Sequence, residues 1–226
     1  MARKPYLGIA MEGPIATWYA RSTRGRLPAF VKTAAEIASW LPAGGAVLEV
    51  APGPGYLAIE IAKLRRYHVT GLDISKSFVR IASQNAASAG VTVDFRHGDV
   101  ARMPFPDASF DFVICQAAFK NFAEPLAALD EIHRVLRAGG SASIQDLRKN
   151  APSHEIDAEI ESMALDPLSA LFTQLTFRFG LLRAAYKVEA IERLASRSRF
   201  GKAQILTNGI GFDLRLTKPE AMRRQP

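Results

Sequence analysis

The sequence predicts an α/β fold in which a mostly parallel β-sheet carries helices on both faces. From about residue 46 onward, short apolar runs alternate with stretches in which apolar residues recur at helical spacing. Strands and helices that alternate at this interval are typical of parallel sheets. Near the end of the sequence, Asn208-Gly209 separates two strand-like runs, which indicates a β-hairpin and at least one antiparallel strand.

The composition of the 226 residues, 48% hydrophobic and 23% charged, is that of a globular domain with one sizeable core. No apolar run reaches the roughly 18 residues of a membrane span, and the first residues lack the pattern of a signal peptide. The single cysteine, Cys115, excludes an intrachain disulfide and a cysteine-based metal cluster. We therefore expect a cytoplasmic protein with no membrane partner.

The net charge of +7 comes mainly from basic residues near both ends of the chain. Such a surface is compatible with nucleic acid, with an anionic membrane or with an acidic substrate. Because no basic motif interleaved with aromatic residues is present, we expect a solvated surface and no nucleic-acid partner.

Seven strands are predicted. Five come from the alternating part of the sequence, at residues 46–51, 68–73, 91–96, 110–116 and 141–147, and two form the hairpin within 202–218. Helical spacing predicts helices at 55–66, 75–90, 124–139 and 187–198. Ser75 is the expected N-cap of the second helix, and Gly139 is the expected end of the third.

These elements predict one domain over residues 1–226. Residues 1–45 are expected to be N-terminal helices that cover the site, and residues 46–148 form the ligand-binding core. Residues 149–185 show helical spacing without an intervening strand, so we expect a helical lid inserted there. Residues 186–226 supply the last helix and the terminal hairpin.

The loop "APGPG", residues 51–55, is the expected ligand contact, because open parallel sheets bind ligands beyond the carboxyl ends of their strands. Gly53 and Gly55 allow a close backbone approach, and the following helix offers free N–H groups. "GPGYLA" matches the dinucleotide pattern G-x-G-x-x-G/A only when displaced from the strand. In register, the three glycine positions of that pattern would be Ala51, Gly53 and Tyr56, of which two are not glycine.

A second interpretation accounts for more residues. "VLEVAPGPG" resembles the E/D-x-G-x-G-x-G loop of class I S-adenosylmethionine (SAM) methyltransferases, and "GLDIS", "GDVARMPFPDASFDFVIC" and "HRVLRAGG" resemble later segments of that family, over residues 45–148. The resemblance is to the core of ubiquinone/menaquinone-biosynthesis methyltransferases. It implies a Rossmann-like seven-stranded sheet whose last strand is antiparallel, with SAM as cofactor and S-adenosylhomocysteine (SAH) as its product.

The resemblance also implies cofactor contacts. Glu49 would face the methionine end of SAM, Asp73 would accept from the ribose hydroxyls, and Asp99 would accept from the adenine amino group. From the residues alone, Asp73 is equally well an N-cap and Asp99 a turn residue. The remaining implied contacts come from the leading helix, the glycine-rich loop and the strand ends: Tyr19, Ala51, Gly53, Gly55, Ile74, Val100 and Gln116.

Ala51 departs from the family, which commonly has glycine at this position. Alanine disfavours a positive φ, so we expect a β or helical conformation there, in a loop stiffened by Pro52 and Pro54. Since Gly53 and Gly55 remain, we expect cofactor binding to be retained.

Methyl transfer needs alignment first, and a base only if the nucleophile carries a proton. The candidates that would face an acceptor follow the fourth and fifth strands or lie on the lid: Lys120, Asn121, Asp146 and His154. Trp18 on the leading helix would close over the site together with Tyr19. Phe172, Phe177 and Phe179 would either wall the acceptor or form ordinary lid core.

No metal-ligand spacing is visible, so we expect no metal. The expected acceptor is a small molecule, methylated on an oxygen, nitrogen or carbon atom that the sequence does not specify. A nucleic-acid methyltransferase, a non-catalytic protein of this fold and an NAD-binding protein remain as alternatives. A homodimer is one option for the oligomeric state.

Overall fold

The structure is a computed structural model that describes residues 6–8, 10–162 and 182–220. Most of the predicted lid lies outside these ranges, including Phe172, Phe177 and Phe179. None of the helices within them is long and apolar enough to cross a lipid bilayer.

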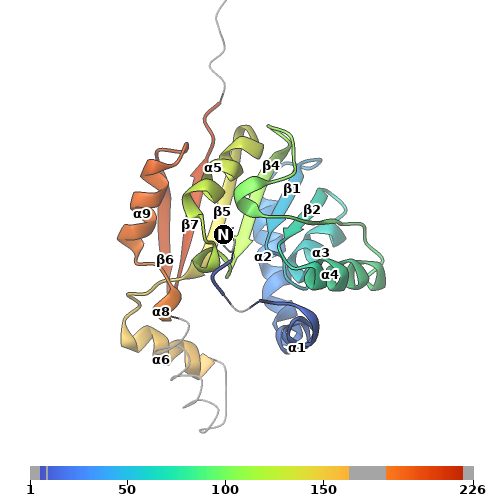
Figure 1. The fold of residues 1–226 in the computed structure, drawn as a ribbon, viewed down its shortest axis with the longest axis horizontal. Helices are drawn as coiled ribbons and strands as arrows, with labels where there is room; N and C mark the ends of the chain where they lie inside the picture. Colours follow the sequence, from blue (N-terminus) through green and yellow to red (C-terminus); the bar gives the residue numbers. More distant parts are fainter. Residues whose placement is uncertain (1–5, 9, 163–181, 221–226) are drawn as a thin grey trace, which may run out of the picture.

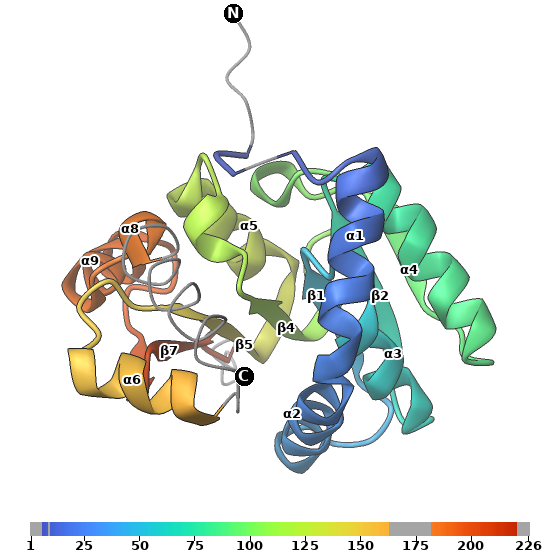
Figure 2. The same cartoon turned by 90° about the horizontal axis from the view of Figure 1, so that it is seen from below.

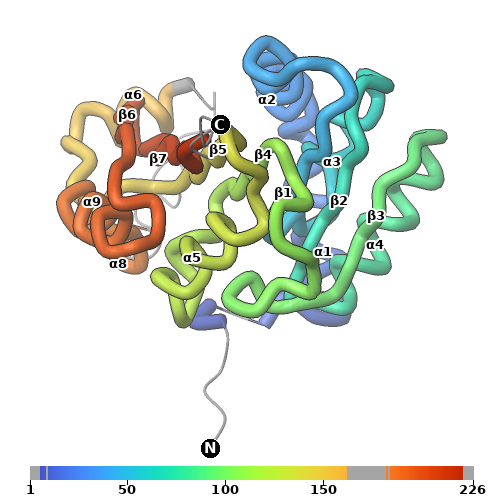
Figure 3. The backbone as a smooth tube through the Cα atoms, turned by 90° about the horizontal axis from the view of Figure 1, so that it is seen from above, coloured from blue at the N-terminus to red at the C-terminus, as the bar shows by residue number. Residues whose placement is uncertain are grey.

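The described chain builds one seven-stranded sheet (Figure 1). Its strands are β1 (Ala46–Val50), β2 (His68–Asp73), β3 (Asp94–His97), β4 (Phe110–Gln116), β5 (Leu136–Leu147), β6 (Gln204–Asn208) and β7 (Gly211–Thr217). They lie in the order β3-β2-β1-β4-β5-β7-β6, which can be followed across Figure 3. Strand β7 runs antiparallel to both of its neighbours, and the other neighbouring pairs are parallel. The mostly parallel sheet with an antiparallel last strand is thus confirmed.

The helices of the described ranges are α1 (Gly13–Thr23), α2 (Leu27–Trp40), α3 (Tyr56–Lys63), α4 (Lys76–Ser88), α5 (Pro125–Val135), α6 (Ser153–Ser162), α8 (Leu182–Ala184) and α9 (Val188–Arg197). Short 3₁₀ turns are η1 (Arg24–Arg26), η2 (Val100–Arg102) and η3 (Phe119–Asn121). Ser75 caps α4 as expected, because its hydroxyl accepts a hydrogen bond from the Phe78 N–H at 3.0 Å.

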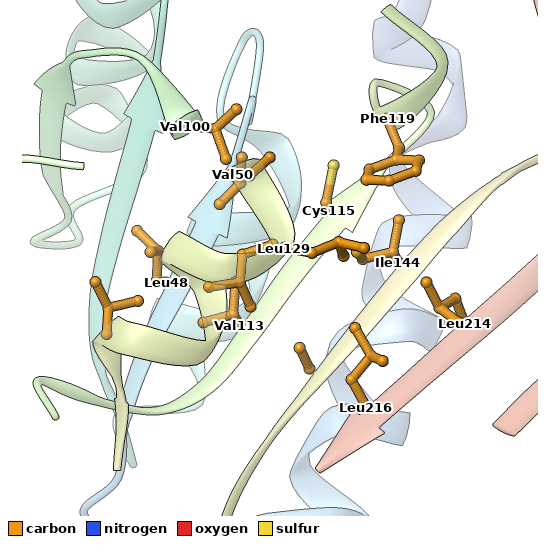
Figure 4. Close-up of a cluster of buried hydrophobic side chains, with 14 of the residues drawn as sticks. Leu48, Val50, Val100, Val113, Cys115, Phe119, Leu129, Ile144, Leu214 and Leu216 are labelled. Atoms are coloured by element: carbon orange, nitrogen blue, oxygen red, sulfur yellow. The ribbon is translucent and has the colours of Figure 1, made fainter. Parts of the chain in front are cut away.

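Both faces of the sheet are buried, because successive residues of a strand point to opposite faces. On one face, Leu48 and Val113 pack in a cluster with Leu129 of α5, which Figure 4 shows together with residues of β5 and β7. On the other face, Val47 and Ile114 belong to a second cluster with residues of α2 and α3. The central strands β1 and β4 are therefore held rigidly from both sides, and their carboxyl ends can position side chains.

One helix boundary was wrong. The third predicted helix was expected to reach Gly139, but α5 ends at Val135, and Leu136 already has an extended conformation and pairs with Phe110 of β4. Leu136 is fully buried, and its packing against the sheet outweighs the helical periodicity of the sequence. Gly139 instead takes a positive φ of 77° within β5, where its N–H donates to the Lys218 carbonyl.

The terminal hairpin was predicted correctly. Strands β6 and β7 pair in antiparallel register from Gln204↔Arg215 to Asn208↔Gly211, and Gly209 turns the chain with φ 51°. Because β7 inserts between β5 and β6, the hairpin extends the sheet on the side away from the glycine-rich loop.

Candidate functional site

Two adjoining cavities lie where the strands β1, β2 and β4 end. The first has a volume of about 370 Å³ and the second about 250 Å³. Their linings share Tyr19 of α1, Ala51 and Gly53 of the loop after β1, and Gln116 and Ala117 at the end of β4. This is the position at which open α/β sheets bind ligands, because the strand order reverses between β1 and β4.

The loop after β1 has three residues in the left-handed region: Ala51 with φ 54°, Gly53 with φ 55° and Gly55 with φ 80°. The expectation that Ala51 would be β or helical is therefore wrong. A left-handed alanine costs about 1–2 kcal/mol, and such a conformation persists only where its surroundings enforce it. Here the Ala51 N–H donates to the Leu72 carbonyl at 2.8 Å and the Gly55 N–H donates to the Pro52 carbonyl at 3.0 Å.

The two glycines of this loop have different surroundings. A Cβ on Gly55 would lie 2.6 Å from the Phe95 ring and 2.8 Å from Ala82, so glycine is required there for packing against β3 and α4. Gly55 lines neither cavity. Gly53 lines both, and the nearest side-chain atoms to its hypothetical Cβ, from Phe78 and Tyr19, are 4.0 Å away. Gly53 is therefore the glycine that leaves room for a ligand.

Asp73 joins the loop after β1 to the start of α4. It is 5% exposed, and its Oδ2 accepts from the Gly53 N–H at 3.0 Å while its Oδ1 accepts from the Ser75 N–H at 2.8 Å. Burial raises the pKa of the Asp73 carboxyl to about 6, although the two backbone N–H groups act in the opposite direction. Since Ser75 is the N-cap of α4, Asp73 is free of that role and lines the first cavity.

The residues expected beside the adenosine gather at the same cavity. Ile74, Asp99 and Val100 all line it. Asp99 also fits the alternative interpretation of a turn residue, because its Oδ1 accepts from the Ala101 N–H at 2.9 Å and caps η2. The sequence thus predicted correctly which residues the strand ends bring together, and their contact with a cofactor stays a prediction.

Glu49 is the unusual carboxylate of the second cavity. It is 4% exposed, and its Oε2 has no hydrogen-bond partner among the described residues. Burial raises the pKa of the Glu49 carboxyl to about 8, partly offset by a backbone N–H bond from Ala58. An unpaired buried carboxyl oxygen is costly unless a ligand supplies a donor. An ammonium group, such as that of the methionine portion of SAM, fits this position.

Arg26 lines the same cavity and was missed by the sequence analysis. Its guanidinium gives the second cavity a positive group in addition to the Glu49 carboxyl, which is the complement of an α-amino-acid zwitterion. In the sequence Arg26 stands in a run with Arg21 and Arg24, so nothing distinguishes it from a solvated basic surface.

An N-terminal strap, residues 6–8 and 10–12, covers part of the first cavity and was also not foreseen. Tyr6 forms a bridge with Phe122, and the Leu7 N–H donates to the Asn121 carbonyl at 2.9 Å. At the other end, the Glu12 carboxylate accepts from two backbone N–H groups at the start of α4, those of Lys76 at 2.9 Å and Ser77 at 3.1 Å. These contacts hold the strap at both of its ends, and Tyr6 lines the first cavity.

Of the residues predicted to be catalytic, only Asn121 lines a cavity. Lys120 and Asp146 form an ion pair at 2.8 Å with side-chain exposures of 8% and 1%. Asp146 also accepts from the Lys120 N–H at 2.9 Å, so the pair attaches η3 to β5. The expectation that these two side chains face an acceptor is corrected, because their charges are buried against each other.

His154 and Trp18 also lie away from both cavities. His154 is exposed at the start of α6, and Trp18 is 67% exposed on α1. Tyr19, the neighbour of Trp18, points to the opposite side and lines both cavities, with its ring 5.7 Å from that of Phe78. Gln116 lines both cavities as well, and its Nε2 donates to Gln145 Oε1 at 2.7 Å.

Among the described residues, no three or more His, Cys, Asp or Glu side chains are grouped in a way that could hold a metal ion. The described linings of the two cavities contain carboxylates, hydroxyls, amides, one guanidinium, aromatic rings and aliphatic side chains.

Comparison with known proteins agrees with this geometry. Residues 48–144 match a family model described as a methyltransferase domain. Demethylmenaquinone methyltransferase of Deinococcus radiodurans is 40% identical over 95 residues, which are 42% of this chain and 39% of that protein. The same enzyme of Chlorobaculum tepidum is 29% identical over 164 residues, 70% of this chain and 66% of that protein. In both cases the chain spans less than two thirds of the relative's length.

Solved structures share the fold. A SAM-dependent methyltransferase from Aquifex aeolicus aligns with a TM-score of 0.67 at 17% identity, covering 88% of this chain and 97% of that one. The plantazolicin methyltransferase, solved with a desmethyl substrate analogue and SAH, aligns with a TM-score of 0.67 at 15% identity, covering 91% and 89%. Residues 48–144 are thus matched to a methyltransferase domain, and the fold of the chain is that of the SAM-dependent methyltransferases with which it aligns.

Proposed function

We propose that this protein transfers the methyl group of SAM to a small, flat and apolar acceptor. The observation that carries the proposal is the pair of joined cavities with Asp73 at one end and the unpaired Glu49 carboxyl at the other. A ligand that extends through both needs hydroxyl donors at one end and an ammonium at the other, and SAM has both.

In this proposal the two joined cavities bind different parts of SAM. Asp73 and Asp99 hold the ribose and the adenine, with Ile74 against the base. Glu49 and Arg26 hold the amino and carboxyl groups of the methionine portion. Gly53, with φ 55°, lets the chain pass close to the cofactor between the two ends.

The acceptor is expected in the part of the first cavity between the strap and the end of β4. Tyr6, Phe122 and Asn121 line it there, together with Ala118. Aromatic side chains favour a planar ring, and small side chains leave room for it. The curated relatives carry the name demethylmenaquinone methyltransferase, which supports an acceptor that resembles a demethylated quinone.

SAM supplies an electrophilic methyl group on a sulfonium, and the chain supplies alignment and exclusion of water. Burial, and next the nearby Asp73 carboxylate, raise the pKa of the Tyr6 hydroxyl above its usual value. Tyr6 therefore stays protonated at neutral pH and is able to donate a hydrogen bond to a ligand. We infer that it orients an oxygen of the acceptor, while Asn121 offers the second polar contact in the same region.

The test is a transfer assay with SAM and a reduced naphthoquinone that lacks the ring methyl. Mass spectrometry of the extracted product should show one methyl group in place of one ring hydrogen, with one SAH formed and one proton released to solvent for each product. A folded protein that binds SAM but methylates neither this acceptor nor related phenols would contradict the proposed acceptor class. A homodimer and a cytoplasmic location stay predictions from the sequence, and a nucleic-acid acceptor stays the less favoured alternative.

A further inference from the structure

Large apolar side chains are exposed mainly near the N-terminus. The described residues expose six of them, and four lie within residues 7–31: Leu7 at 69%, Ile15 at 46%, Trp18 at 67% and Val31 at 51%. An exposed tryptophan is uncommon in the surface of a protein that meets only water. The grouping of four exposed apolar side chains within residues 7–31 indicates that this segment contacts a partner.

Helix α1 has two distinct faces. Ala16 and Ala20 are buried against the protein, whereas Ile15 and Trp18 lie one turn apart on the outward face. Figure 2 looks directly onto this helix, with no other element in front of it. The two large apolar side chains are therefore presented together to the surroundings.

The same segment is basic. Arg21, Arg24 and Lys32 are exposed, and none of them forms an ion pair within the described part of the chain. Residues 13–35 contain no Asp or Glu. Basic groups without ion pairs, on the same segment as exposed Trp and Ile side chains, are complementary to an anionic lipid surface, in which aromatic side chains lie at the level of the headgroups.

We propose that the α1–α2 surface, defined by Ile15, Trp18, Arg21, Arg24, Val31 and Lys32, docks on an anionic lipid bilayer. This differs from the sequence-based expectation of no membrane partner, which rested on the lack of a spanning segment. A peripheral helix needs no such segment. On the inward side of the same segment, Tyr19, Thr23 and Arg26 line the second cavity, so docking brings the site next to the bilayer, where apolar molecules dissolve.

The two tryptophans of the chain make this surface measurable. Trp40, which is 42% exposed and lies against Arg215, is outside the proposed contact. In a Trp40→Phe variant only Trp18 fluoresces, and in a Trp18→Phe variant only Trp40 does. Vesicles of equal parts phosphatidylcholine and phosphatidylglycerol should shift the Trp18 emission to the blue and leave the Trp40 emission unchanged. Vesicles of phosphatidylcholine alone, or high salt, should remove the shift.

Charge variants provide the matched control. The triple substitution Arg21→Gln, Arg24→Gln and Lys32→Gln should weaken sedimentation with the mixed vesicles by about tenfold or more. The triple substitution Arg193→Gln, Arg197→Gln and Lys202→Gln removes the same number of exposed charges near α9. This variant should sediment with the mixed vesicles as the unchanged protein does. Thermal unfolding and SAM titration verify that both variants are folded.

Three outcomes would overturn the proposal. The first is an unshifted Trp18 emission in mixed vesicles. The second is equal loss of sedimentation in the two charge variants, which would mean that net charge alone attracts the protein. The third is a Trp18 shift with RNA or DNA but not with vesicles, which would assign the surface to nucleic acid. None of these measurements requires turnover, so they stand apart from the proposed methyl transfer.

Discussion

Asp73 and Gly53 are joined by a hydrogen bond of 3.0 Å, from the backbone N–H of the loop after β1 to the carboxylate at the end of β2. The two residues are 20 positions apart in sequence, and the bond sets how the loop lies over the cavities. A carboxylate that also accepts from Ser75 has a fixed orientation. The same side chain therefore shapes the loop and faces the proposed ribose position.

We predict that Asp73→Ala weakens SAM binding by about 1–3 kcal/mol, from the loss of charge-assisted hydrogen bonds to the ribose. Calorimetric titration measures this. Asp94→Ala, which removes an exposed carboxylate paired with Arg96, is the matched control and should bind SAM as the unchanged protein does. A folded Asp73→Ala protein of unchanged affinity would refute the ribose role.

Glu49 gives a prediction about stability and pH. Its pKa in the folded protein, about 8, lies above the ordinary 4.5, so between these values the folded state binds more protons than the unfolded state. Without ligand, its contribution to stability is fully present below about pH 4.5 and is lost as the pH rises through 8. Glu49→Gln removes this dependence.

The free energy of unfolding of the ligand-free protein is the quantity to measure, by denaturant titration from pH 5 to pH 9. The Glu49→Gln variant should gain stability over the unchanged protein as the pH rises, on the order of 3 kcal/mol in total. Taking the difference between the two proteins cancels other groups that titrate in this range, such as Asp73. A difference that stays constant with pH would disprove that Glu49 is buried without a partner.

Ala51 offers a test of backbone strain. Ala51→Gly relieves a left-handed alanine and adds freedom to the unfolded chain, and together these predict a net gain in stability of about 0.5–1 kcal/mol. Ala35→Gly, at an exposed position inside α2, should instead lose about 1 kcal/mol. Opposite signs in denaturant unfolding confirm the strained conformation. Equal losses at both positions would rule it out.

A substitution in the ion pair of Lys120 and Asp146 distinguishes a structural role of Lys120 from a catalytic one. Lys120→Met leaves the Asp146 carboxylate buried without its cation and should destabilise the protein by about 3–5 kcal/mol. If the role is structural, the activity of the variant should fall only in proportion to its folded fraction, which circular dichroism measures at several temperatures. The pH profile of turnover should keep the shape that it has in the unchanged protein. A stable variant with no turnover would return Lys120 to the catalytic residues.

The sequence predicted the sheet well, because its signals are local. The alternation of strand and helix, the N-cap Ser75 and the turn at Gly209 each depend on a few neighbouring residues. The boundary of α5 was missed because Leu136 is pulled into β5 by burial, which no local pattern reveals. The left-handed Ala51 was missed for a similar reason, since the Leu72 carbonyl that holds it comes from another strand.

The site was predicted in part. Residues at or just after the strand ends, such as Asp73 and Val100, were found through the resemblance of their segments to the methyltransferase family, and the parallel sheet brings them to one edge. Tyr6 and Arg26 were missed because they come from segments without a motif and reach the cavities only through tertiary packing. Lys120 and Asp146 were placed correctly at strand ends, but the sequence could not show that they would pair with each other.

The central claim is that SAM lies across the two cavities between Asp73 and Glu49. Calorimetric titration of the ligand-free protein with SAM and, separately, with NAD tests it most directly, with Asp73→Ala and Glu49→Gln measured alongside. We expect SAM to bind, both variants to bind it more weakly, and NAD to produce no heat of binding. Tight binding of NAD without binding of SAM, or SAM affinity that neither substitution changes, would contradict the account.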